Sequence, residues 1–135
     1  MLLRGAVVSG MGNFSYWIEK LQEHYLRKTG MRFYPGTLNV RLDAPYSLPK
    51  RVIRLEASEY GGTVSVNIVP CVIRIPGQVI DGQIDGKQAF LLRTDANEEG
   101  CGHHPKTIVE IAAEVRLRDH FGLQDCDLVE IEIEA

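Results

Sequence analysis

The sequence has few cysteines, no long apolar run and no surplus of positive charge, and each shortage excludes a class of protein. Its three cysteines, Cys71, Cys101 and Cys126, are odd in number and widely spaced, which argues against a disulfide framework and for a reducing compartment. No apolar stretch is long enough to span a bilayer, and the first residues carry no signal-peptide pattern. We therefore expect a cytoplasmic protein without a membrane partner.

The charge balance argues against nucleic-acid binding. The 18 acidic residues outnumber the 15 basic ones, so the formal net charge is −3, whereas a nucleic-acid-binding surface normally shows an excess of Lys and Arg. The sequence also lacks a helix-turn-helix pattern and a basic arm. With 135 residues, 44% of them hydrophobic, the chain is expected to form one domain, residues 1–135, and to act as a monomer.

The distribution of short β-type segments predicts a mainly β fold. A first strand at residues 2–9 is followed by a glycine turn and one long helix, residues 13–29, whose apolar stripe contains Trp17, Leu21 and Tyr25. Residues 115–122 are expected to hold one helical turn, and many short strands beside a single long helix indicate a small barrel. The other strands are expected at residues 37–42, 52–57, 63–69, 71–75, 78–84, 89–94, 107–113 and 127–134; alternatively, 71–75 and 78–84 form a hairpin across Pro76-Gly77, with a bulge at Gly82.

The segment Pro35-Gly36-Thr37-Leu38-Asn39-Val40 places two oxygen-bearing side chains at alternate positions. Alternate side chains of a strand point the same way, so Thr37 and Asn39 share one face while Leu38 and Val40 share the other. With the apolar face buried, a hydroxyl and an amide oxygen are displayed together, which suits Mg²⁺ whose charge is balanced by a bound nucleotide. The simpler alternative is a Pro-Gly turn followed by an ordinary edge strand.

The turn Gly10-Met11-Gly12-Asn13 joins the first strand to the helix and is a candidate anion site. Its backbone N–H groups and the positive end of the helix dipole attract anions, and glycine lets a phosphate approach the backbone closely. The motif is neither a Walker sequence nor a complete G-x-G-x-x-G, so an ordinary tight turn is the alternative.

Three charged residues closer to the C-terminus are further candidates. Glu110 lies in the apolar stretch 107–113, where an unpaired buried carboxylate is costly. It therefore either faces a ligand cavity, as a base or as a hydroxyl acceptor, or points to solvent on an edge strand. Arg116 and Arg118 lie near one chain reversal and are suited to clamp a phosphate or a base edge, although arginines are also common on surfaces.

The polar loop of residues 95–106 contains Glu98-Glu99 and Cys101-Gly102-His103-His104. Cysteine and histidine bind zinc, but a zinc site usually needs a second ligand pair at suitable spacing, and the sequence shows none. A mobile polar loop beside a pocket is the better interpretation.

In order and content, these segments resemble the archaeal CTP-dependent riboflavin kinase family over nearly the whole chain. The resemblance implies a compact six-stranded cradle-loop barrel, of Greek-key type and related to RIFT barrels. It also implies transfer of the γ-phosphate of CTP to the 5′-hydroxyl of riboflavin, giving CDP and FMN. The most specific match is P-G-T-L-N-V at residues 35–40; the supporting matches are residues 5–12, Ile80-Asp81-Gly82, Val109-Glu110-Ile111, Leu117-Arg118-Asp119 and Phe121-Gly122-Leu123.

The resemblance further implies roles for single residues. Thr37 and Asn39 would hold Mg²⁺, and Glu110 would meet the ribityl chain of riboflavin, either as a base or as a group that orients the acceptor. Thr94 is the best match to a threonine that contacts the flavin. The nucleotide would lie against Met11, Gly12, Asn13, Phe14, Ser15 and Tyr16 on one side and against Val115, Arg116, Leu117 and Arg118 on the other.

The chain departs from the family pattern at three places. Phe14 stands where members often carry a further glycine, which implies a tighter or reshaped phosphate cradle, and Cys126 stands where a glycine is common in the last turn. The loop between Thr94 and Glu110 is longer than usual, which leaves open an altered lid, a changed acceptor, or a barrel that binds nucleotide or flavin without transferring phosphate. ATP in place of CTP also stays open, because spacing does not reveal the choice of base.

Overall fold

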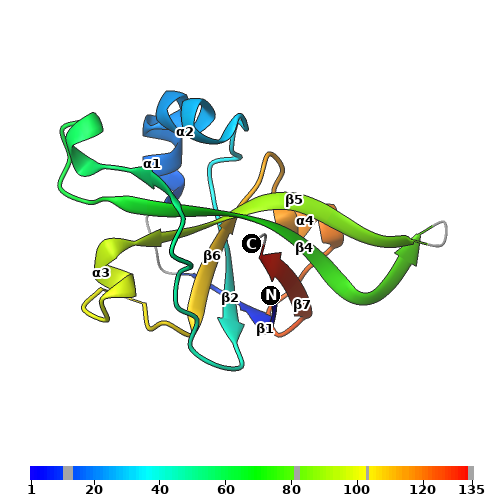
Figure 1. Ribbon diagram of the computed structural model, residues 1–135. Helices are drawn as coiled ribbons and strands as arrows, with labels where there is room; N and C mark the ends of the chain where they lie inside the picture. Colours follow the sequence, from blue (N-terminus) through cyan, green and yellow to red (C-terminus); the bar gives the residue numbers. More distant parts are fainter. Residues whose placement is uncertain (11–13, 81–82, 103, 134–135) are drawn as a thin grey trace.

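The computed structural model describes residues 1–10, 14–80, 83–102 and 104–133, and its central feature is a closed antiparallel barrel. Six strands follow one another in the order β4-β5-β6-β2-β1-β7, and β7 pairs back onto β4 to close the barrel (Figure 1). A short seventh strand, β3, pairs only with β4. The predicted mainly β, six-stranded barrel is therefore confirmed. The strands are β1 (Leu2–Val8), β2 (Leu38–Leu42), β3 (Ile53–Leu55), β4 (Val66–Ile80), β5 (Gln83–Thr94), β6 (Ile108–Ala112) and β7 (Leu128–Ile133).

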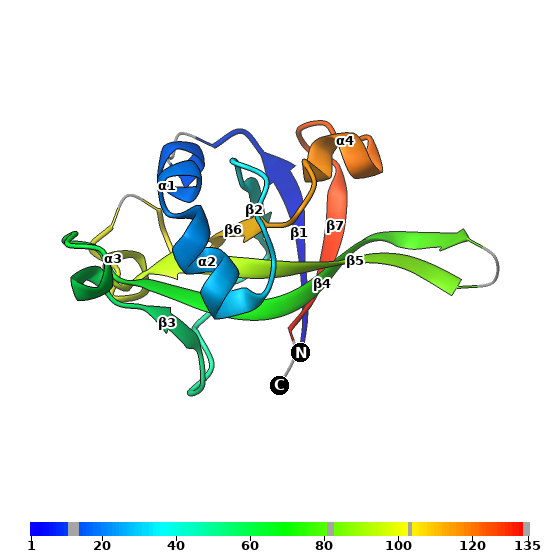
Figure 2. The same cartoon turned by 90° about the horizontal axis from the view of Figure 1, so that it is seen from above.

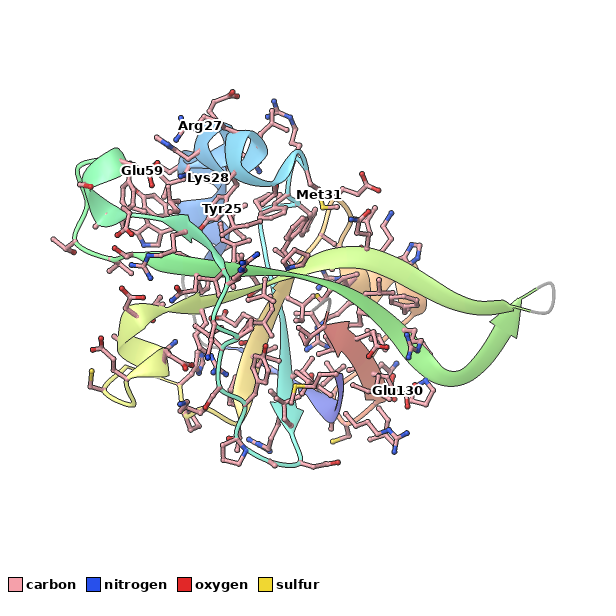
Figure 3. All side chains as sticks on the ribbon, in the orientation of Figure 1. Tyr25, Arg27, Lys28, Met31, Glu59 and Glu130 are labelled. Atoms are coloured by element: carbon pink, nitrogen blue, oxygen red, sulfur yellow. The ribbon has the colours of Figure 1, made fainter. Side chains whose placement is uncertain are left out.

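Alternating side chains supply two apolar cores, one on each side of the barrel wall. Inside the barrel, Leu38 and Val40 of β2 are buried, as their alternation with Thr37 and Asn39 predicted. Outside the barrel, helices α1 (Phe14–Lys20) and α2 (Gln22–Thr29) cover β3, β4 and β5 (Figure 2). The buried Tyr25 points from α2 toward these strands (Figure 3).

The single long helix predicted for residues 13–29 is wrong, because the structure has two short helices that meet at Leu21. Leu21 has φ −107° and ψ 22°, which lies outside the helical range, although hydrogen bonds continue on both sides of it. Leu21 and Tyr25 of the predicted stripe are nevertheless buried, at most 5% exposed, and so is Ile18, whereas Trp17 is half-buried. The non-helical backbone of Leu21 therefore divides the predicted helix without taking Ile18, Leu21 or Tyr25 out of the core.

Strand β4 is continuous where the sequence predicted three separate segments. Pro70 lies inside it, between the part that pairs with β3 and the part that pairs with β7, so no partner on that edge needs its missing N–H. The alternative hairpin across Pro76-Gly77 is also wrong. Gly77, with φ 72°, sits where the β4–β5 register shifts, and β4 continues to Ile80 in an arm that projects from the barrel (Figure 2). The predicted bulge at Gly82 falls outside the described residues.

Three short helical segments complete the chain. The expected helical turn is α4 (Leu117–Phe121), whereas α3 (Asp95–Glu98) begins the loop that was expected to be irregular. The 3₁₀ helix η1 (Ala57–Glu59) is tied to α2 by an ion pair of 2.8 Å between Lys28 Nζ and Glu59 Oε1 (Figure 3). Among the helices of the described part, none has both the length and the apolar character needed to cross a membrane.

Arg93 of β5 is 2% exposed and fixes two loops to one end of the barrel. Its guanidinium donates to the backbone carbonyl oxygens of Tyr46 and of Lys106, the latter at 3.1 Å. It also pairs with the carboxylate of Glu98 at 2.8 Å. The segment before β3 and the loop after α3 are thus held by one buried cation.

Replacing Arg93 with methionine is expected to lower the free energy of unfolding by about 3 kcal/mol, because a buried ion pair loses one partner and two carbonyls lose their donor. Urea unfolding followed by circular dichroism measures this loss. Arg41→Met is the matched control: Arg41 is exposed on β2, so its replacement is expected to change stability by less than about 0.5 kcal/mol. Equal stability of the two variants would show that Arg93 does not hold the loops.

Cys126 adopts a left-handed backbone conformation, with φ 77°, in the turn before β7. Its N–H donates to the carbonyl oxygen of Val7 at 2.8 Å, so the turn is fixed to β1 in this conformation. A side chain with a Cβ atom costs about 1–2 kcal/mol in this region, whereas glycine adopts it freely. The geometry explains why glycine suits this position.

Cys126→Gly is therefore expected to raise the free energy of unfolding by about 1 kcal/mol, since the relief of strain exceeds the extra entropy that glycine gives the unfolded chain. Urea unfolding at constant pH checks the gain. Cys126→Ala keeps the strained Cβ and should bring no gain. A glycine variant less stable than the alanine variant would contradict the prediction.

Candidate functional site

A cavity of about 180 Å³ lies on the outer face of the barrel, beside β2 and β6 and the start of α1. Asn39 of β2 stands directly opposite Val8 of β1 on one side and Glu110 of β6 on the other. Directly opposed residues of antiparallel strands project to the same face, so the Asn39 and Glu110 side chains emerge together. The cavity is lined by Gly10, Phe14, Ser15, Gly36, Thr37, Asn39, Glu110 and Arg118.

Glu110 is a buried acid, only 5% exposed, and so the alternative of a solvent-facing residue on an edge strand is wrong. Burial raises its pKa from an ordinary value of 4.5 to about 7, because the charged form loses its hydration. A hydrogen bond of 2.9 Å from the Thr37 hydroxyl to Glu110 Oε1 acts in the opposite direction and stabilises the carboxylate. The site therefore holds a carboxyl group that exchanges its proton near neutral pH.

Asn39 contributes an amide oxygen that lacks a protein partner. The residue is 8% exposed, and within the described residues its buried Oδ1 accepts no hydrogen bond. Leaving such an atom unpaired costs free energy, which is unusual in a native structure unless a ligand or ion completes it. Gly10 packs against the same amide, and a Cβ at position 10 would overlap it, so glycine there makes room for Asn39.

The donor set around this oxygen fits Mg²⁺. The Thr37 hydroxyl gives its proton to Glu110, so its oxygen lone pairs stay available for a cation. Together with Asn39 Oδ1, it offers two neutral oxygens, and Mg²⁺ takes its few protein ligands from oxygen and fills the other positions with water and phosphate. The predicted pair Thr37 and Asn39 thus lies on one wall of one cavity.

A second, smaller cavity of about 80 Å³ adjoins the first and shares Gly36, Thr37 and Arg118 with it. Arg118 of α4 is held from behind, by Asp125 Oδ1 at 2.7 Å and by the carbonyl oxygen of Val8 at 3.3 Å. Arg118 therefore lines both cavities, and these two contacts orient its guanidinium. The second cavity is lined by Tyr34, Gly36, Thr37, Leu38, Ile111, Val115, Arg116, Leu117 and Arg118, which includes the whole predicted segment 115–118.

The other residues predicted for the site are placed unequally. Phe14 and Ser15 line the larger cavity, whereas Tyr16 is 58% exposed and lines neither. Thr94 also lines neither cavity. Its hydroxyl accepts a hydrogen bond of 3.1 Å from the backbone N–H of Asn97 and so caps α3. Its contact with a flavin stays a prediction. Met11, Gly12 and Asn13 fall outside the described residues.

The structure adds three residues that the sequence did not assign to the site. Ser9 Oγ donates to Asp125 Oδ2 at 2.5 Å, and Asp125 in turn holds Arg118, so these two side chains orient a lining residue. His104 Nε2 lies 3.9 Å from Glu110 Oε2. Spacing carried no signal for Ser9 or Asp125, which come from different loops, whereas His104 belongs to the polar loop that was expected beside a pocket.

His104 also belongs to the cysteine- and histidine-containing cluster whose composition suggests zinc, although its spacing does not. Within residues 1–10, 14–80, 83–102 and 104–133, no group of three or more His, Cys, Asp and Glu side chains is placed to hold a metal ion. His104 is instead directed to the acid of the cavity.

The sequence was also compared with known proteins and protein families. The family model CTP-dep_RFKase, described as "Domain of unknown function DUF120", matches residues 7–133. The chain is 31% identical over 144 residues to "Riboflavin kinase" of Pyrobaculum arsenaticum, an alignment covering 97% of this chain and 60% of that protein. Proteins with the same name are 29% identical in Methanoregula boonei, with 97% and 56% covered, and 33% identical in Pyrobaculum calidifontis, with 97% and 59% covered. The chain thus spans about three fifths of the length of these curated relatives.

Proposed function

Because this chain belongs to the CTP-dep_RFKase family, we propose that it is a riboflavin kinase, which transfers the γ-phosphate of CTP to the 5′-hydroxyl of riboflavin and releases CDP and FMN. The name of the relatives supports the reaction. This chain spans only part of the length of these relatives. We therefore propose that residues 1–135 catalyse the reaction by themselves.

The observation that carries the proposal is the meeting of Thr37, Asn39 and Glu110 in one cavity. Enzymes that transfer a phosphoryl group mainly position the reactants and neutralise phosphate charge, and they need little covalent chemistry from the protein. A buried acid next to two neutral oxygen ligands provides a place for the acceptor hydroxyl beside a place for a cation. Asn39 of β2, Glu110 of the adjacent β6 and Thr37, which directly precedes β2, would supply both places.

Glu110 is proposed as the base. The 5′-oxygen of riboflavin forms a bond to the γ-phosphorus while the bond from that phosphorus to the β,γ-bridging oxygen breaks, and the hydroxyl proton passes to Glu110. A pKa of about 7 suits this task, because the group is partly ionised at neutral pH and still holds a proton well enough to accept one. The hydrogen bond from Thr37 to Oε1 keeps the carboxylate in one orientation.

Thr37 and Asn39 are proposed to hold Mg²⁺, which when bound neutralises charge on the phosphate oxygens. The nucleotide would lie along Phe14, Ser15 and Tyr16 and contact Met11, Gly12 and Asn13, and its other side would face residues 115–118. Arg118 lines both cavities and is already oriented, so it is suited to pair with a phosphate group where they meet.

Incubation of the purified chain with riboflavin, Mg²⁺ and either CTP or ATP tests the proposal, with FMN separated from riboflavin by chromatography and detected by flavin fluorescence. FMN formed faster with CTP than with ATP is the expected result. Calorimetric binding of riboflavin or CTP without any FMN would identify the alternative, a sensor barrel that has lost transfer. If neither ligand binds, the kinase proposal fails.

A further inference from the structure

Among the described residues of the long loop after α3, His104 approaches the acid of the cavity. Its Nε2 atom lies 3.9 Å from Glu110 Oε2, and the histidine side chain is 20% exposed while that of Glu110 is 6% exposed. The two oxygens of Glu110 are thus used differently. Oε1 accepts the hydrogen bond from Thr37, whereas the ion-pair partner of Oε2 in the described part of the chain is this more distant histidine.

The loop that carries His104 is fixed at several points. The N–H of His104 donates to Asn97 Oδ1 at 3.3 Å, and the same amide oxygen packs so closely on Gly102 that a Cβ there would overlap it. Arg93 holds the two ends of the loop through Glu98 and the carbonyl oxygen of Lys106. His104 is therefore presented to Glu110 by a braced loop.

A separation of 3.9 Å is too long for a direct hydrogen bond but is suited to a shared hydroxyl. An oxygen placed about 2.8 Å from both atoms makes an angle of about 90° between them. This is about 20° below the tetrahedral angle between the donor and acceptor directions of an alcohol, a deviation that hydrogen bonds tolerate because they remain strong at D–H···A angles down to about 150°. Such an alcohol donates its proton to Glu110 Oε2 and accepts a hydrogen bond from His104 when Nε2 carries the proton.

We propose that His104 Nε2 and Glu110 Oε2 form a two-point subsite for the primary hydroxyl of the acceptor alcohol, so that His104 is a substrate-binding residue. This inference rests on the proposed riboflavin kinase function and names the group that recognises the reacting hydroxyl. The histidine fixes the acceptor oxygen through one lone pair, while the other remains directed to the phosphate. An acceptor without that hydroxyl gains nothing from His104.

A comparison of riboflavin with 5′-deoxyriboflavin, which lacks the reacting hydroxyl, isolates the contact. Binding to the purified chain without nucleotide is followed by the change in flavin fluorescence. The unsubstituted chain should bind riboflavin more tightly than the deoxy analogue. His104→Ala should raise the Kd for riboflavin about 2- to 10-fold, the value of one hydrogen bond, and leave the Kd for the deoxy analogue unchanged. His104→Gln, which keeps a side-chain N–H, should recover part of the loss.

His24→Ala is the matched control, because His24 lies on α2 beside Tyr60 and does not contact Glu110. It should bind both flavins as the unsubstituted chain does. An equal loss of affinity for both flavins in His104→Ala would mean that the histidine only shapes the loop, and no loss for either would remove it from the site; each result overturns the inference. If the unsubstituted chain forms FMN, those results leave the kinase function intact, whereas failure of that chain to bind riboflavin refutes both.

Discussion

Replacing Glu110 with glutamine is expected to lower kcat for FMN formation by about 10²- to 10⁴-fold, the range typical for loss of a general base. Glutamine keeps the size of the side chain and an oxygen that can accept the Thr37 hydrogen bond, but it cannot take up the hydroxyl proton. Initial rates of FMN formation at saturating riboflavin and CTP measure the effect. Glu114→Gln is the matched control, since Glu114 is exposed and pairs with Lys87 away from both cavities.

Although Glu110→Gln is expected to lower the rate, it is expected to raise the free energy of unfolding above neutral pH. The unfolded chain releases the Glu110 proton near pH 4.5, whereas the folded chain holds it until about pH 7. Between these values the folded state binds a proton that the unfolded state does not, so stability falls as pH rises through this window. This pKa shift corresponds to roughly 3 kcal/mol of folding free energy. The contribution is lost progressively between pH 4.5 and 7 and is absent at higher pH.

Urea unfolding at a series of pH values between 4 and about 8.5 separates the two variants. The unsubstituted chain should lose stability from pH 4.5 to 7, and Glu110→Gln should lose less over the same interval and be the more stable of the two at the alkaline end. Normal turnover by the glutamine variant would show that Glu110 orients the acceptor without taking its proton. Parallel pH profiles of stability would show that the carboxyl group is not held in its neutral form.

The face on which Thr37 and Asn39 lie was predictable from the sequence, because a strand alternates and Leu38 and Val40 need a core. Glu110 could be suspected, since an acid within an apolar strand is costly to bury. What the sequence could not supply is the register that sets Asn39 directly opposite Glu110. That register pairs β2 with β6, two strands far apart in the chain, and no local pattern reveals it.

The features that were mispredicted are those in which long-range packing overrides a local signal. Pro70 read as a strand boundary, yet it is tolerated because β4 changes its edge partner there from β3 to β7. The apolar stripe continues through Leu21, yet the backbone of this residue leaves the helical range and divides the segment into α1 and α2. His104 is a different case, because its loop was expected beside a pocket and not at a zinc site. What the sequence did not show is its approach to Glu110, in a loop that Arg93 and Asn97 hold by hydrogen bonds.

Thr37→Ala and Asn39→Ala are each expected to lower kcat/KM for CTP by about 100-fold or more and to raise the Mg²⁺ concentration needed for half-maximal rate. Each substitution removes one of two oxygens that we propose as ligands. The expected effect on folding is small for Asn39→Ala, because its Oδ1 has no hydrogen-bond partner in the described structure. Removing an unpaired buried polar atom relieves a desolvation penalty of about 1–3 kcal/mol and offsets the lost packing. Rates across a Mg²⁺ titration and urea unfolding without Mg²⁺ give the two readouts.

Asn67 is the matched control for this pair of readouts, because it is a buried asparagine with its hydrogen bonds satisfied. Its Oδ1 accepts from Arg54 at 2.8 Å, and its Nδ2 donates to Asp95 at 2.8 Å, away from both cavities. Asn67→Ala should therefore lower stability and keep the Mg²⁺ dependence, the reverse of Asn39→Ala. If Asn39→Ala unfolds as easily as Asn67→Ala and keeps its Mg²⁺ midpoint, then Asn39 supports the fold and the cation is held elsewhere. If both position-37 and position-39 variants turn over normally, the cation assignment is wrong, and the unpaired amide oxygen needs another explanation.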